Sequence, residues 1–214
     1  MQRYAVQSCF EEEKQTLISE SEDEPIFIPV YKWDSKNIKI AITGAQHRCG
    51  VTVTAINMAS WLKTRGASVC YIEKNENRHL QWIMGFYGAE QTENHYSVEG
   101  IDCYLTNELD SDYNFIIYDC GVMQSPTAIF KNSDIRIHCG SLLPYDMQSY
   151  KNSLNACKNL SITALSLELP DILAKSSLEF IGTEIVSLKA SHDLFANNVN
   201  SHIYMPLVQK WIVE

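Results

Sequence analysis

Residues 38–65, IKIAITGAQHRCGVTVTAINMASWLKTR, decide the fold of this chain. The run Ile38–Thr43 is short and rich in β-branched residues, which predicts a β-strand. Between residues 52 and 65 the apolar side chains recur at the spacing of one helix face: Val53, Ile56, Ala59 and Leu62. A strand, a loop and a helix are therefore expected in succession.

The alternation of strands and helices continues along the chain. Further extended segments are expected at residues 68–72, 98–105, 114–118, 135–139, 162–167 and 184–188. Helices are expected at residues 80–87 and 145–157. Because strands that alternate with helices form right-handed crossovers, the pattern predicts a three-layer α/β fold with a mostly parallel sheet. The fully apolar run 114–118 fits a strand covered on both faces.

Composition narrows the class of protein. The chain has 214 residues, 45% of them hydrophobic, which is typical of a globular domain. Its net charge of −9 argues against a protein that coats nucleic acid. No stretch approaches the roughly 20 apolar residues of a membrane span, and residues 1–10 do not read as a secretory signal. A cytoplasmic protein is expected, with peripheral contact at the inner membrane face as an option.

The acidic charge is concentrated near the N-terminus. Residues 11–24 hold seven acids and one Lys, and such a block usually stays solvated. We expect an acidic arm and extended segment at residues 1–34, followed by one α/β domain at residues 35–214. The apolar part of that segment, residues 25–33, is expected to pack on the domain edge. An interaction tail is the alternative for the acidic part.

The loop between the first strand and helix is a candidate phosphate-binding site. Glycines and a helix N-terminus can direct backbone N–H groups at an anion. Gly50 and Thr52 match the end of the motif G-x-x-x-x-G-K-[ST], but Val51 stands where that motif has Lys. The predicted binding residues are Gly44, Gln46, His47, Arg48, Cys49, Gly50, Val51, Thr52 and Val53.

This loop resembles the deviant Walker A motif of the ParA/MinD family of ATPases, K-G-G-V-G-K-T-T, which leads into a helix with A-x-N-L-A. Five residues carry the match: Gly50, Thr52, Thr54, Asn57 and Ala59. On this register Gln46 replaces the family's signature lysine, which reaches across an ATP-sandwiched dimer. Val51 replaces the phosphate-binding lysine. The two glycines and the valine are replaced by His47, Arg48 and Cys49.

Three later segments extend the resemblance over roughly residues 37–190. Val69–Asn75 is similar to V-L-x-I-D-x-D, Tyr113–Gly121 to the Walker B strand, and residues 132–137 to A-A-D-x-V. The resemblance implies a P-loop NTPase-like fold that binds ATP or ADP with Mg²⁺. Asp119 and Thr52 would hold the metal. The structural alternative for Asp119 is a residue that begins a turn.

The departures from the family imply weak or absent hydrolysis. Both lysines are missing, and the second switch aspartate is Asn75, whose amide cannot accept a proton from water. Loss of a charge clamp can cost about 10³–10⁵ in rate. The pattern of losses is similar to the TadZ/CpaE-like branch, which implies a localisation or assembly factor that forms a homodimer or joins a pilus, secretion or partition-type assembly. Two alternatives stay open: a pseudo-NTPase scaffold that binds no nucleotide, and an active ATPase with Arg48 as replacement lysine.

The cysteines and the C-terminal segment give weaker indications of function. The seven cysteines lack metal-ligand spacing and are expected to be reduced and buried. A Cys49–Cys120 redox pair is a minor alternative. MinD-like proteins place an amphipathic C-terminal helix on membranes, but residues 206–213 contain only Lys210 as a basic residue. Packing of this segment on the core or on a partner is therefore expected.

Overall fold

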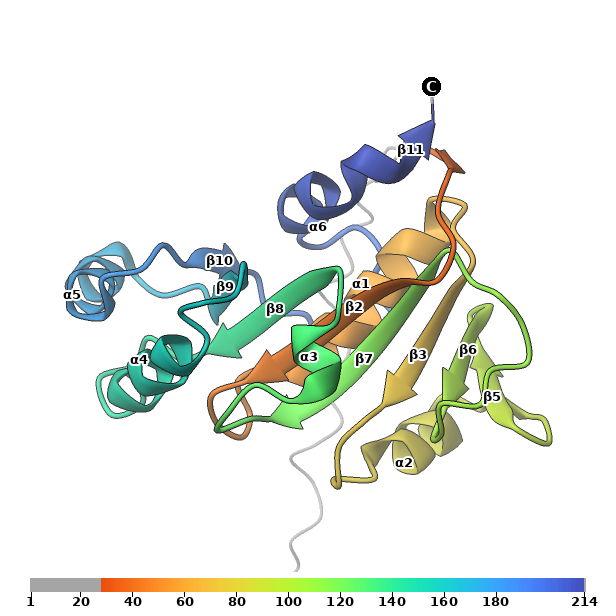
Figure 1. The fold of residues 1–214 in the computed structure, drawn as a ribbon, viewed down its shortest axis with the longest axis horizontal. Helices are drawn as coiled ribbons and strands as arrows, with labels where there is room; N and C mark the ends of the chain where they lie inside the picture. Colours follow the sequence, from red (N-terminus) through yellow and green to blue (C-terminus); the bar gives the residue numbers. More distant parts are fainter. Residues whose placement is uncertain (1–27, 214) are drawn as a thin grey trace, which may run out of the picture.

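A computed structural model describes residues 28–213. A nine-stranded sheet forms its centre, in the order β10-β9-β8-β2-β7-β3-β6-β5-β4 (Figure 1). The strands are β2 (Ile38–Gly44), β3 (Val69–Glu73), β4 (Glu90–Gln91), β5 (His95–Val98), β6 (Ile101–Tyr104), β7 (Phe115–Val122), β8 (Ile135–Gly140), β9 (Thr163–Leu167) and β10 (Val186–Leu188). Neighbours from β10 to β6 run parallel, whereas β5 and β4 pair antiparallel.

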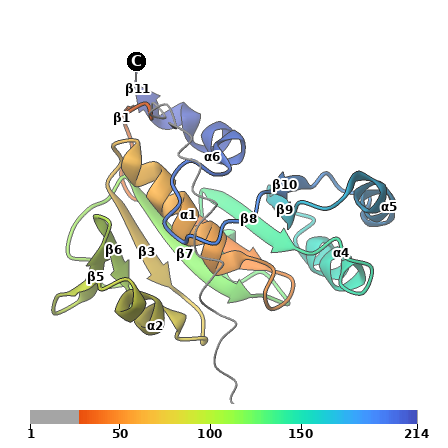
Figure 2. The same ribbon diagram turned by 180° about the vertical axis from the view of Figure 1, so that it is seen from behind.

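Helices cover both faces of this sheet, which makes the three-layer α/β fold that the sequence predicts (Figures 1 and 2). They are α1 (Val51–Thr64), α2 (His79–Phe86), α3 (Ala128–Lys131), α4 (Met147–Ala156), α5 (Asp171–Ile181) and α6 (Ser201–Val208). One core lies between the sheet and α1, α2 and α6, and a second core lies under α3. Because strand side chains alternate, Phe115 and Ile117 of β7 enter the first core, and Ile116 and Tyr118 enter the second.

The two ends of the described chain meet. The strand β1 (Lys32–Trp33) pairs antiparallel with β11 (Ile212–Val213). The Trp33 ring packs edge-on against Phe115, and its indole N–H donates to the Arg65 carbonyl at 2.9 Å. This segment therefore packs on the domain, as expected. The acidic block 11–24 lies outside the described residues, so the arm and its boundary stay a prediction.

One expected element is wrong in detail. Residues 98–105 form no single strand, because Glu99 and Gly100 have φ values of 51° and 71° and turn the chain between β5 and β6. Positive φ at both central residues is typical of a tight hairpin turn. Near the C-terminus, α6 ends at Val208, before most of the apolar run at 206–213. Val208 is fully buried, so this end packs on the core.

None of the described helices is long and apolar enough to cross a membrane.

Candidate functional site

The 44–52 loop lies at the carboxyl ends of the central parallel strands and leads directly into α1 (Figures 1 and 2). Backbone hydrogen bonds fix its first residues to the two neighbouring strands. The Ala45 N–H donates to the Cys139 carbonyl at 2.9 Å, and the Met123 N–H donates to the Gly44 carbonyl at 2.9 Å. Ligands of open parallel sheets bind at this edge, so the loop occupies the position expected of a binding site.

Two left-handed residues shape the loop. Arg48 has φ of 64° and Gly50 has φ of 93°. Alternation of left- and right-handed residues turns successive N–H groups toward one side and makes an anion-binding concavity. Gly50 is also the N-cap of α1 and offers no side-chain hydrogen bond to the first turn of the helix. The loop therefore retains donors for an anion although Arg48 stands where the resembling motif has glycine.

The underside of the loop is closely packed. A Cβ on Gly44 would clash with Cys49 Sγ and would lie 2.6 Å from Val51 Cγ2, so only glycine fits there. The Cys49 thiol donates to the Cys139 carbonyl, and burial raises its pKa. Both Cys49 and Val51 are buried, so their side chains support the loop from beneath, and a ligand-binding role for either residue stays a prediction.

The remaining predicted residues of the loop differ in exposure. His47 and Arg48 are exposed, whereas Thr52 and Val53 are half-buried in the first turn of α1. Within residues 28–213, both polar atoms of the Gln46 amide are buried without a hydrogen-bond partner. Burial of an amide without a partner costs about 1–3 kcal/mol. The Gln46 amide is thus a group in this loop that a bound polar ligand could satisfy.

Asp119 and Thr52, 67 residues apart in sequence, meet at the loop. The Thr52 hydroxyl donates to Asp119 Oδ2 at 2.7 Å, and the Tyr71 hydroxyl donates to the same oxygen at 2.8 Å. Asp119 Oδ1 accepts the Asn75 amide and the Gly121 N–H, each at 3.0 Å. The bond from Gly121 lies within β7, so Asp119 is held both by its own strand and by residues beside the loop, and its metal and turn-forming roles both stay predictions.

Two residues match the family's switch aspartates, Glu73 the first and Asn75 the second, and both have structural contacts here. Glu73 is buried, and its carboxylate accepts the N–H groups of His79 and Leu80 at the start of α2. Burial raises the pKa of Glu73 against the effect of these bonds. Asn75 donates to both the carboxylate and the backbone carbonyl of Asp119. Neither side chain is a free base.

Tyr71 and Gly121 were not singled out from the sequence. A two-residue period along β3 places Tyr71 on the α1 face of the sheet, the same face as Asp119 of β7. Burial and the Asp119 carboxylate raise the pKa of Tyr71 well above its usual value, so its hydroxyl stays a donor. The alternation of side chains along the strand is therefore the sequence signal that predicts the position of Tyr71.

Asn57 and Ala59, which anchor the resemblance in the helix, are structural. The Asn57 amide donates to the carbonyls of Asp193 and Leu194, at 3.1 and 2.6 Å, and Ala59 is fully buried. These contacts fasten the segment before α6 to α1. All six described cysteines are free thiols and buried, as expected.

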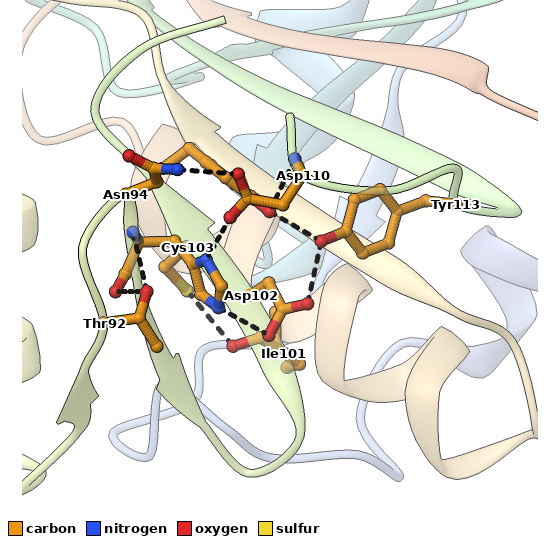
Figure 3. Close-up of polar contacts among 9 residues, drawn as sticks. Thr92, Asn94, Ile101, Asp102, Cys103, Asp110 and Tyr113 are labelled. Atoms are coloured by element: carbon orange, nitrogen blue, oxygen red, sulfur yellow. Dashed lines mark hydrogen bonds and ion pairs between the residues drawn. The ribbon is translucent and has the colours of Figure 1, made fainter. Parts of the chain in front are cut away.

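A second polar cluster lies at the sheet edge formed by β5 and β6 (Figure 3). His95 Nδ1 lies 3.0 Å from Asp110 Oδ2, and His95 Nε2 lies 3.5 Å from Asp102 Oδ1. The Tyr113 hydroxyl donates to Asp102 at 2.8 Å and contacts the Tyr104 hydroxyl at 2.8 Å. Since both His95 nitrogens face carboxylates, this cluster ties the chain after β6 to the hairpin.

The residues of the loop fit the phosphates of a nucleotide better than they fit a metal. The loop offers a concave backbone, an uncapped helix start and the Gln46 amide. Among the described residues, no group of three or more His, Cys, Asp or Glu side chains converges to hold a metal ion. Thr52 and Asp119 are the predicted magnesium residues, and their mutual hydrogen bond leaves that role a prediction.

No protein-family model and no curated protein sequence matches the chain. Solved structures do match it. A Borrelia burgdorferi plasmid partition protein bound to AMPPNP is 13% identical, with a TM-score of 0.54 over 80% of this chain and 95% of that one. MinD in the Aquifex aeolicus MinC:MinD complex is 11% identical, with a TM-score of 0.56 over 81% and 94%. A ParA-family ATPase from Chlorobium tepidum is 11% identical, with a TM-score of 0.50 over 82% and 95%. This chain therefore has the three-layer α/β fold of ParA- and MinD-type P-loop ATPases.

Proposed function

We propose that this protein binds an adenine nucleotide, ATP or ADP, at the 44–52 loop, hydrolyses it weakly or not at all, and acts as a localisation or assembly factor. The observation that carries the proposal is the loop itself. Its backbone keeps the left-handed residues Arg48 and Gly50 and an uncapped helix start, although the sequence has lost both motif lysines. Backbone N–H groups at a helix start can bind phosphate without a lysine side chain.

Weak hydrolysis follows from the side chains around the loop. Phosphoryl transfer depends on positioning and on charge neutralisation. Gln46 and Val51 stand at the lysine positions, and Asn75 donates its amide to Asp119 instead of offering a base. Arg48 is exposed and forms no ion pair within the described residues, so replacement of the lysine by Arg48 remains the route to an active enzyme.

An assembly role is supported by an exposed aromatic pair. Trp82 and Phe86 stand one turn apart on α2 and are 82% and 85% exposed. Large aromatic side chains are enriched at protein interfaces. The partner would be a second copy of this chain or a protein of a pilus, secretion or partition-type assembly. Light scattering of the wild type and of a Trp82→Ser, Phe86→Ser variant tests self-association.

Calorimetric titration with ADP and ATP, combined with an assay of phosphate release, tests the nucleotide proposal. Binding with phosphate release at the background rate is the expected result. Release well above background that disappears in Arg48→Ala would favour the active ATPase. If neither nucleotide binds, the nucleotide proposal is wrong and the pseudo-NTPase scaffold is the favoured alternative.

A matched pair of lysine substitutions sharpens this test. Val51→Lys restores the charge at the motif position and should tighten nucleotide binding by roughly tenfold, because one partly desolvated contact to phosphate is worth about 1–2 kcal/mol. Val53→Lys adds the same charge two residues later on α1 and should have a much smaller effect. Equal effects of the two variants would mean that Val51 does not face the phosphates.

A further inference from the structure

We infer that the nucleotide binds at the 44–52 loop without a divalent cation, because Asn75 and three other donors hold Asp119 in a state that no metal can use. This inference rests on the proposed function and adds to it the chemical form of the ligand. It disagrees with the magnesium site that the sequence predicts at Thr52 and Asp119.

The Asp119 carboxylate has no acceptor position left. An ionised carboxylate offers about four lone-pair sites. Two of them, on Oδ2, accept the hydroxyls of Thr52 and Tyr71 at 2.7 and 2.8 Å. The other two, on Oδ1, accept the Asn75 amide and the Gly121 N–H at 3.0 Å. Both a direct metal bond and a hydrogen bond from a metal-bound water need a free site.

Asp119 is also closed to solvent. Its side chain has 0% exposure, whereas Asn75 above it is half-buried. Asn75 is itself fixed, since its Oδ1 accepts the Asn77 N–H at 2.9 Å and its amide reaches the Asp119 carbonyl at 3.1 Å. Asn75 therefore acts as a positioning residue that covers the carboxylate.

Gly121 makes room for this cover. It has φ of 60°, and a Cβ built on it would lie 2.7 Å from Asn75 Cβ. Any side chain at 121 would push Asn75 away from Asp119. The glycine, the amide and the carboxylate thus form one closed arrangement at the ends of β3 and β7.

What remains for a cation is the Thr52 oxygen, whose proton is donated to Asp119. A single neutral oxygen is a poor protein ligand for Mg²⁺, which is usually held by one or two carboxylates besides substrate phosphates. The phosphates are then neutralised by loop N–H groups and by the start of α1 rather than by metal.

The direct experiment is titration of the full-length protein with ADP, once in EDTA and once in excess Mg²⁺. Dissociation constants that agree within about threefold would support the inference. Binding at least tenfold tighter with Mg²⁺ would overturn it while leaving the proposed function standing. No binding in either buffer would overturn both, and the outcomes are thus distinguishable.

Substitutions at Asn75 test the assigned cause. Asn75→Asp places a second carboxylate beside Asp119, and Asn75→Ala uncovers Oδ1 without adding charge. Both should make ADP binding about tenfold tighter with Mg²⁺ than in EDTA. Asn75→Asp should also bind Mn²⁺ in the absence of nucleotide, which paramagnetic resonance detects. Asn77→Asp adds the same charge at an exposed position of the same turn and should stay indifferent to metal.

Circular dichroism and thermal unfolding show which variants fold. If Asn75→Asp does not fold, Asn75→Ala carries the test. If folded variants at Asn75 remain indifferent to Mg²⁺ and Mn²⁺, Asn75 does not control metal access and the inference is wrong.

Discussion

The Thr52 hydroxyl lies 2.7 Å from Asp119 Oδ2 and joins the first turn of α1 to the end of β7. Asp119 is fully buried, and its carboxylate also accepts hydrogen bonds from Tyr71, Asn75 and Gly121. A carboxylate in such a position depends on every donor that it has. The bond therefore supports both the fold and the start of the helix on which the proposed phosphate site depends.

Replacement of Thr52 by Ala should lower the free energy of unfolding by about 1–3 kcal/mol, because Asp119 loses a donor and the loss leaves a buried charge partly unsatisfied. Nucleotide affinity should fall by roughly tenfold, a loss of about 1.4 kcal/mol of binding free energy. Thr52→Ser keeps the hydroxyl and should restore most of both quantities. Urea unfolding and calorimetry measure them.

A control for Thr52→Ala is Thr64→Ala at the other end of the same helix. The Thr64 hydroxyl donates within α1, to the carbonyls of Ser60 and Trp61. Its loss should leave nucleotide affinity unchanged. If Thr52→Ala and Thr64→Ala bind nucleotide equally well, the 44–52 loop is not the binding site.

Gly44→Ala should disrupt the loop from beneath. The added methyl group would clash with Cys49 Sγ and would lie 2.6 Å from Val51 Cγ2, and both side chains are buried. Overpacking of this kind costs about 1–3 kcal/mol. We expect a lower midpoint of thermal unfolding and weaker nucleotide binding.

Gly85→Ala provides the matched control for Gly44→Ala. A Cβ at Gly85 meets nothing within 4 Å, and the residue lies inside α2. Ala is favoured over Gly in a helix by about 1 kcal/mol, so this variant should be more stable than the wild type. A Gly44→Ala protein as stable as Gly85→Ala would contradict the packing described for the loop.

Much of the sheet follows from local pattern. The β-branched run before the loop forms β2, and the apolar run before Asp119 forms its neighbour β7. Both runs are apolar because a central strand is buried on both faces. The 3.6-residue period of α1 is equally plain. Order along the chain also predicts that Thr52 and Asp119 lie at the same edge of the sheet, since parallel strands end together.

Other features depend on contacts that no local pattern encodes. The helix α5 has a short amphipathic period and follows a proline, and no helix was expected there. The local pattern predicts one strand across Glu99 and Gly100 because the flanking residues are extended on both sides of the hairpin turn. The donors of Asp119 come from α1, β3, the residues after β3 and β7 itself, so its saturation is visible only in three dimensions.

Substitutions of Arg48 test whether this residue lowers the stability of the fold while its charge strengthens nucleotide binding. Its φ of 64° is left-handed, a conformation that costs a residue with a Cβ roughly 1 kcal/mol. Arg48→Gly should therefore stabilise the protein by up to about that amount. Arg48→Asn removes the charge but keeps a residue that tolerates this conformation. If Arg48 neutralises phosphate, both variants should bind ADP more weakly by a similar factor.

Unfolding and calorimetry separate the two contributions of Arg48. A loss of affinity only in Arg48→Gly would assign the effect to backbone freedom rather than to charge. Unchanged affinity in both variants would exclude Arg48 as a replacement for the missing lysine. The active-ATPase alternative would then have no cation in the loop to support it.

His138 predicts how stability depends on pH. The ring is fully buried in β8, its Nε2 lies 2.8 Å from the Ser153 hydroxyl, and burial lowers its pKa to about 4. In the unfolded chain a histidine titrates near 6.5. Between these values the unfolded state binds one more proton than the native state, so the free energy of unfolding should rise with pH.

The size of this effect follows from the shift in pKa. A difference of about 2.5 pH units corresponds to roughly 3 kcal/mol of stability, which is fully present above pH 6.5 and is lost as the pH falls from 6.5 to 4. Carboxylates also titrate in this range, so the quantity to measure is the difference between wild type and His138→Gln by urea unfolding at several pH values. A His138→Gln protein with the same slope as the wild type would mean that His138 is protonated in the native state, because only an unchanged proton count on folding leaves the slope unaltered.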